Sequence, residues 1–237
     1  NAVPTRNTAG PVAGSRGKVY KVLPMSGPNT GGRTVTLKMC VLVCLMACCG
    51  LFIPAAEGSE VSVFSEVFCD IGDAQSIEEN LSTFSSHIKN VIEITERAGG
   101  KSLVLIDELG GGTDPEEGQA LAKAVLSYLL RKDCRGIVTT HYSALKEFAY
   151  AESGIENASM EFDMSTLRPL YKVSLGVPGS SNAIAISRRL GLSEEILRDA
   201  VANLSEGAQR FENIIRTAEQ GRIEEDQAKT RRARIRR

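Results

Sequence analysis

Eight consecutive residues near one end of the chain have the composition of a loop that binds phosphate. They are Gly27, Pro28, Asn29, Thr30, Gly31, Gly32, Arg33 and Thr34, here called the glycine loop, and they match the pattern GxxxxGK[ST] at every defined position but one. Glycines allow backbone N–H groups to close around phosphate oxygens at the start of a helix. The hydroxyl of Thr34 is placed to bind Mg²⁺. The glycine loop therefore predicts a site for ATP and Mg²⁺.

Position 33 departs from this pattern, because the pattern has lysine there and the chain has Arg33. Lysine is a slim point charge that reaches between the β- and γ-phosphates. Arginine keeps the charge but is bulkier and donates hydrogen bonds through a flat fork. We expect nucleotide binding to survive this change better than the geometry of hydrolysis.

A second group of residues with the chemistry of a nucleotide site lies further along the chain. Residues 103–106 are apolar and are followed directly by Asp107 and Glu108. A buried strand that delivers two carboxylates is costly unless a cation meets them. As a Walker B strand, it would use Asp107 to hold Mg²⁺, usually through water, and Glu108 to orient the attacking water. The structural alternative is a strand-to-turn junction that happens to end in two acids.

The elements that must position these residues alternate between strands and helices. We predict strands at 19–25, 60–70, 102–107, 136–140 and 170–175, and helices at 35–49, 76–98 and 116–130. Short apolar strands such as 102–107 are typical of a parallel sheet covered on both faces. The predicted fold class is therefore α/β, with a mainly parallel sheet covered by helices. From Ser193, a good N-cap, we predict a helical and charged extension.

Composition bounds the function without identifying it. The 237 residues are enough for one α/β domain and an appendage, and the formal net charge of −1 gives no global nucleic-acid signal. Residues 231–237 contain five arginines, which could contact nucleic acid or form a solvated tail.

Residues 39–56 form an uncharged run that raises the question of a membrane span. Gly50 and Pro54 break the run, and it follows the glycine loop directly, so we predict a soluble core helix. Cysteines at 40, 44 and 48 follow a helical spacing with no histidine or acid beside them. We interpret them as small buried hydrophobic residues in a reducing compartment rather than metal ligands.

Four motifs together resemble the ATPase domain of the MutS family in order and spacing. They are GPNTGGRTVTLK from Gly27, DIGDAQSIEENLSTFSSH from Asp70, LVLIDELGGGTDPEEG from Leu103 and TTHY from Thr139. The chain is most similar to the second type of MutS, a branch linked to suppressing recombination and typically followed by an Smr nuclease domain. The resemblance implies an ABC-type P-loop NTPase fold, a DNA-dependent ATPase and a homodimer with composite ATP sites. It also implies a role in DNA repair or control of recombination.

The resemblance also implies roles for single residues. Gln75 would sense Mg²⁺ and the γ-phosphate, and Ser82 would be the signature serine that contacts the nucleotide of the opposite subunit. Asp114 would lie in a turn that faces the dimer partner, and His141 would be the switch histidine near the γ-phosphate. From the residues alone, Ser82 could simply cap a helix and His141 could be a core histidine. His141 does follow a buried strand, at the edge where ligand sites of parallel sheets form.

By this resemblance the chain divides into an irregular segment at 1–17, an ATPase domain at 18–192 and a helical, basic-ended extension at 193–237. The sequence begins with Asn1, and we treat it as a fragment. We expect DNA to be bound through regions largely absent from it, in bacterial cytoplasm or in an organelle, with no membrane association.

Two other functions compete with the ATPase. The alternative that Arg33 leaves open is a nucleotide-binding dimerisation module that does not hydrolyse ATP. An ABC-transporter ATPase would carry LSGGQ, where this chain has LSTFSS from Leu81.

Overall fold

The computed structural model shows a single mixed sheet with helices on both faces, and it describes residues 20–28, 31–56, 59–72, 83–205, 207, 209–218, 220–221 and 224. The strands are β1 (Val22–Ser26), β2 (Glu66–Asp70), β3 (Ser102–Ile106), β4 (Arg135–Thr139), β5 (Ala158–Asp163) and β6 (Arg168–Leu175). The helices are α1 (Arg33–Cys48), α2 (Thr83–Arg97), α3 (Pro115–Arg131), α4 (Ser143–Ala151), α5 (Ala183–Arg189) and α6 (Glu194–Ala202). The strand order is β2-β3-β4-β1-β5-β6. All neighbouring strands are parallel except β6, which is antiparallel to β5.

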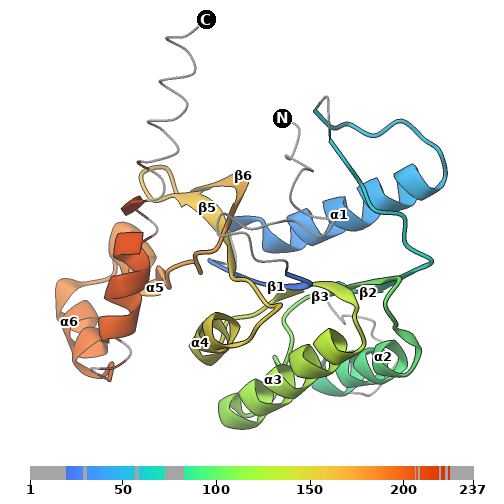
Figure 1. Ribbon diagram of the computed structural model, residues 1–237. Coiled ribbons are helices and arrows are strands. Elements are labelled where there is room, and N and C mark those ends of the chain that lie inside the picture. Colours follow the sequence, from blue (N-terminus) through green and yellow to red (C-terminus); the bar gives the residue numbers. More distant parts are fainter. Residues whose placement is uncertain are drawn as a thin grey trace, which may run out of the picture.

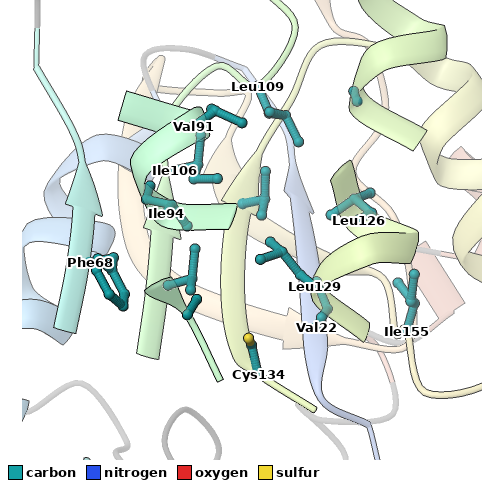
Figure 2. Close-up of a cluster of buried hydrophobic side chains, with 14 of the residues drawn as sticks. Val22, Phe68, Val91, Ile94, Ile106, Leu109, Leu126, Leu129, Cys134 and Ile155 are labelled. Carbon is teal, nitrogen blue, oxygen red and sulfur yellow. The ribbon is translucent and has the colours of Figure 1, made fainter. Parts of the chain in front are cut away.

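Helix α1 lies on one face of the sheet, and α2, α3 and α4 lie on the other (Figure 1). Each face has its own apolar core. Under α1, Leu37 and Cys44 pack with Leu105 of β3. On the opposite face, Ile106 of β3 packs in a cluster with Leu126 of α3 (Figure 2). Because both faces are covered, every residue of β3 is buried, which explains the apolar run at residues 103–106.

The central strand β1 contains a proline, which usually argues against a central position. The N–H of Gly136 donates a hydrogen bond to the carbonyl of Lys21. The backbone N–H and C=O groups of the odd-numbered β1 residues therefore point toward β4. The nitrogen of Pro24 therefore points toward β5, between one isolated bridge formed by Val22 and the regular ladder that begins at Met25. The proline ring thus lies before the regular ladder on that side and removes no hydrogen bond from the pairing with β4.

The predicted α/β class is confirmed, whereas several predicted boundaries are wrong. The helices predicted at 35–49 and 116–130 correspond to α1 and α3, and α2 covers the described part of the helix predicted at 76–98. The strand predicted at 60–70 is too long, because only Glu66–Asp70 pairs with β3. Strand β5 and helix α4 are absent from the prediction. The predicted segment at 1–17 and the arginines at 231–237 lie outside the described residues.

The uncharged run at 39–56 is helical only as far as Cys48. Within the part of the chain that the structure describes, no helix combines the length and the apolar character needed to cross a membrane. The predicted burial of the cysteines holds for Cys44, which is 3% exposed. It is wrong for Cys48, which is exposed near the end of α1, where the helix extends past the sheet core.

The extension predicted from Ser193 begins with α6. The Ser193 hydroxyl accepts a hydrogen bond from the N–H of Ile196, which confirms the predicted N-cap. Helices α5 and α6 lie together beyond the β5–β6 end of the sheet (Figure 1). Leu197 of α6 and Ile215 further along the chain are both buried, so this part of the extension is packed rather than solvated.

Leu126, fully buried in the core of Figure 2, is expected to contribute strongly to stability. Leu126→Ala should lower the free energy of unfolding by about 2–5 kcal/mol, because it leaves a cavity in a packed core. Leu121→Ala, on the exposed side of the same helix, is the matched control and should change it by less than about 0.5 kcal/mol. Urea unfolding followed by circular dichroism measures both. Equal losses would contradict the described packing of α3.

Candidate functional site

The predicted site residues converge at the carboxyl ends of three neighbouring strands. In the order β3-β4-β1, Asp107 and Glu108 follow β3, Thr140 and His141 follow β4, and the glycine loop follows β1. Ligands of open parallel sheets bind at such carboxyl ends. The strand order therefore assembles the candidate site from segments that are far apart in the sequence.

The described part of the glycine loop leads directly into α1. Gly32 is the N-cap of α1, has a φ of 84°, and offers no side chain to cap the first N–H groups. A Cβ atom at Gly32 would lie 2.7 Å from the ring of Tyr171 on β6, and the positive φ itself favours glycine. The start of α1 thus presents uncapped N–H groups, an arrangement that suits anions. Asn29 and Thr30 lie outside the described residues.

Thr34 and Asp107, the two predicted Mg²⁺ ligands, are in direct contact. The Thr34 hydroxyl donates a hydrogen bond to Oδ2 of Asp107 over 2.6 Å. Asp107 is only 8% exposed, and its backbone N–H donates to the carbonyl of Asp70 over 2.8 Å. A nearly buried carboxylate needs hydrogen-bond donors, and the Thr34 hydroxyl supplies one of them.

Thr139 is a component of the site that the sequence analysis misses. Its hydroxyl donates a hydrogen bond to Oδ1 of Asp107 and accepts one from the N–H of Glu108. Thr139 is completely buried at the end of β4. It therefore fixes both acids of the β3 end at once. The signals in the sequence are a polar residue closing an apolar strand and its place at the start of the TTHY motif.

Glu108 and His141 form an open pair beside this buried cluster. Glu108 has a φ of 52°, in the left-handed region that a non-glycine residue occupies only at a cost in energy. Nε2 of His141 lies 3.1 Å from Oε1 of Glu108, and the two side chains are 46% and 53% exposed. A water molecule from solvent can therefore reach both groups.

The side chain of Arg33 is buried and engaged at the end of β4. Its Nη1 donates to the carbonyl of Thr140 over 2.9 Å, and Nη2 lies 3.1 Å from Nε2 and 3.4 Å from Nδ1 of His141. Burial lowers the pKa of Arg33, while the charges of Asp107 and Glu108 act to raise it. Arginine stays protonated in proteins. The site therefore contains one buried positive charge opposite two carboxylates.

The imidazole of His141 lies between a donor and an acceptor. In a neutral ring one nitrogen donates and the other accepts. Nε2 lies 3.1 Å from Oε1 of Glu108 and also 3.1 Å from Nη2 of Arg33, while Nδ1 lies 3.4 Å from the same Nη2. A protonated Nε2 can donate to Glu108, whereas an unprotonated Nε2 can accept from Arg33, so the tautomer decides which neighbour this nitrogen bonds.

Two of the remaining predicted site residues, Gln75 and Ser82, lie outside the described residues. Asp114 is described, and its Oδ1 accepts hydrogen bonds from the N–H groups of Glu116 and Glu117 as the N-cap of α3. Asp114 is exposed at this turn, so capping occupies one carboxylate oxygen on a surface residue.

The start of α2, which directly follows Ser82, is held by a further buried acid. Nδ1 of His87 and Nδ2 of Asn90 each lie 2.7 Å from a carboxylate oxygen of Asp70. Asp70 also accepts the N–H of Asp107 on its backbone carbonyl. The same residue thus supports both α2 and the metal-binding candidate.

Comparisons with known proteins identify the family of the chain. Residues 23–207 match the family described as MutS domain V, and the chain belongs to the MutS family. It is 55% identical over 206 residues to a protein of Caldanaerobacter subterraneus subsp. tengcongensis named endonuclease MutS2. This alignment covers 87% of this chain and 26% of that protein. A relative of the same name in Geobacillus kaustophilus is 54% identical, and the alignment covers 90% of this chain and 28% of the relative. Another in Clostridium botulinum is 52% identical, and the alignment covers 90% of this chain and 27% of the relative. These relatives indicate the MutS2 branch. The chain spans about a quarter of their length.

Thr139→Val should destabilise the fold, because it keeps the shape of the side chain but leaves Oδ1 of Asp107 and the N–H of Glu108 without their partner. We expect a loss of about 1–3 kcal/mol in the free energy of unfolding. Thr139→Ser retains the hydroxyl and should lose less. Urea unfolding of the two variants provides the comparison, and equal stability would show that the hydroxyl does not hold the acids.

Proposed function

We propose that this chain is a P-loop ATPase domain that binds ATP and Mg²⁺ within a MutS-like DNA-binding protein. The observation that carries the proposal is the 2.6 Å contact between Thr34 Oγ1 and Asp107 Oδ2. This contact places a hydroxyl of the glycine loop and a carboxylate at the end of β3 close enough to bind the same metal ion. The match to MutS domain V supports the ATPase assignment.

The donor set fits Mg²⁺. This ion prefers oxygen ligands and is usually held by one or two carboxylates together with phosphates and waters. Thr34 and Asp107 supply a hydroxyl and a carboxylate oxygen side by side. Among the described residues, no group of three or more histidines, cysteines and acids is placed to hold a metal ion. When bound, Mg²⁺ would neutralise phosphate charge.

The triphosphate would lie across the start of α1. Uncapped N–H groups after Gly32 would donate to phosphate oxygens. The ring of Tyr171, half exposed and close to Gly32, forms an apolar wall beside this helix end. Glu108 and His141 would face the terminal phosphate from the ends of β3 and β4. Glu108 would orient the attacking water, and His141 would stabilise its position.

Arg33 supports the alternative, a nucleotide-binding dimerisation module without hydrolysis. Its guanidinium is committed to Thr140 and His141, so it must leave these partners in order to reach a phosphate. Transition-state stabilisation requires donors that are already in place. We infer that Arg33 reduces turnover more than nucleotide affinity, because its charge still attracts the triphosphate.

The role of the whole protein follows from its family. We propose that the domain acts as a homodimer with composite ATP sites, with Gln75 and Ser82 serving the nucleotides. Its nucleotide state would control DNA binding by regions beyond this chain, in DNA repair or in the control of recombination. DNA would in turn stimulate ATP hydrolysis.

Replacing Arg33 tests this reading. Arg33→Lys should raise kcat by about 100-fold, since a lysine can place its charge between the phosphates. The affinity for a fluorescent ATP analogue should change by less than about fivefold, because both side chains are cationic. Steady-state ATP turnover and fluorescence titration in Mg²⁺ measure the two quantities.

The matched control is the double variant Arg33→Lys with Glu108→Gln, which should bind the analogue but lose the gained turnover. If Arg33→Lys leaves kcat unchanged while the parent chain hydrolyses ATP, the arginine is productive and our reading of it is wrong. If both chains bind the analogue but neither hydrolyses ATP, the alternative function is supported.

A further inference from the structure

The carboxylate of Glu212 connects the C-terminal extension to the ATPase core. Its Oε1 lies 3.0 Å from Nζ of Lys146 on α4 and accepts the Ser181 hydroxyl over 2.9 Å. Its Oε2 accepts the backbone N–H of Ser181 over 2.7 Å. One carboxylate therefore holds two separate parts of the core.

This ion pair is shielded from solvent. The side chain of Lys146 is 4% exposed and that of Glu212 is 19% exposed. Burial raises the pKa of Glu212, but the hydrogen bonds from Ser181 and the charge of Lys146 outweigh it and leave the pKa below its usual value. Removing one partner would leave the other charge uncompensated. The contact is thus specific, unlike an ion pair on an open surface.

The loop that Glu212 holds lies against the glycine loop. The N–H of Gly179 donates to the hydroxyl of Ser26 over 2.8 Å. A Cβ atom at Gly179 would lie 2.9 Å from the Cα of Gly27, so only glycine allows this approach. A shift of Ser181 would therefore be transmitted through two residues to the backbone that is proposed to wrap the phosphates.

The same residues border a cavity of about 370 Å³ next to the candidate site. Its lining includes Lys146 and Ser181 together with Gly27, Pro28 and His141. The cavity thus spans from the anchored loop to the glycine loop and the histidine. Its shape depends on where Glu212 fixes Ser181.

We propose that Glu212 and Lys146 are positioning residues for nucleotide binding, through which the C-terminal extension sets the wall of the nucleotide site. This inference rests on the proposed function. The extension is then a working part of the site rather than a linker. Displacement of the extension would loosen loop 179–182 and weaken nucleotide binding. Bound nucleotide would in turn stabilise the packed position of the extension.

The test uses the whole chain and three variants. Glu212→Gln removes the charge at nearly constant size. Lys146→Met with Glu212→Leu replaces the ion pair by apolar side chains, an exchange that is often neutral or stabilising, but it leaves Ser181 without its acceptor. Glu195→Gln, an exposed acid on α6, is the matched control. Three quantities are measured: affinity for a fluorescent ATP analogue with Mg²⁺, the thermal unfolding midpoint, and the rate of tryptic cleavage after Arg216.

We expect Glu212→Gln to weaken binding of the analogue by about fivefold or more and to speed cleavage of the extension. The apolar double variant should recover the unfolding midpoint and resist cleavage, yet bind the analogue as weakly as Glu212→Gln does. Glu195→Gln should match the parent chain in all three measurements.

Three outcomes would overturn the inference. If the parent chain and Glu212→Gln bind the analogue equally, Glu212 does not position the site. If the double variant recovers both stability and affinity, the ion pair only attaches the extension. A parent chain that does not bind the analogue contradicts the proposed function itself, and this inference with it.

Discussion

The hydrogen bond between Thr34 and Asp107 is the constraint around which the site is organised. It joins the first turn of α1 to the end of β3, although the two strands that lead to these residues are not neighbours. Strand β4 lies between β1 and β3 in the sheet. Residues at the end of β4 therefore take part in the site. The Thr139 hydroxyl donates a hydrogen bond to Asp107, and the Thr140 carbonyl accepts one from Arg33. The order of the strands thus decides which side chains can act together.

Charge balance in this site depends on residues from all three strands. Asp107 is nearly buried and is held by neutral hydroxyls, whereas Glu108 remains open to solvent. The only cation that the glycine loop itself brings is Arg33, which is buried at the end of β4. A bound metal ion would relieve the unbalanced charge of Asp107. Under the proposed function, the position of Arg33 would let nucleotide affinity and turnover change separately.

Local sequence predicts the chemical groups of the site but not their connections. The glycine loop and the acids after β3 can be recognised in the sequence, because few other functions combine these residue types at this spacing. Thr139 cannot be found in this way, since its role comes from the neighbouring strand. The direction of the Arg33 side chain is also set by tertiary contacts with Thr140 and His141.

The fold shows the same division between local and tertiary information. Strand β3 is predicted because residues 103–106 form a short apolar run, and all of its residues are buried. Strand β5 is not predicted, because it contains the acid Glu161. This acid is buried by pairing with Ser174 and Lys172 of β6, and no local pattern in the sequence indicates these partners. The predicted boundary at 192 falls between α5 and α6, which pack against each other.

The central claim is that Thr34 and Asp107 form one metal-dependent nucleotide site. Titration of a fluorescent ATP analogue with and without Mg²⁺, on the parent chain and on Thr34→Val, tests it most directly. Thr36→Val, two residues further along α1, is the matched control, because the Thr36 hydroxyl bonds Gly32 and Met160 rather than Asp107. We predict that Mg²⁺ strengthens binding about tenfold or more in the parent and in Thr36→Val, and has little effect in Thr34→Val. Weak binding that is the same with and without Mg²⁺ in all three chains would contradict the account.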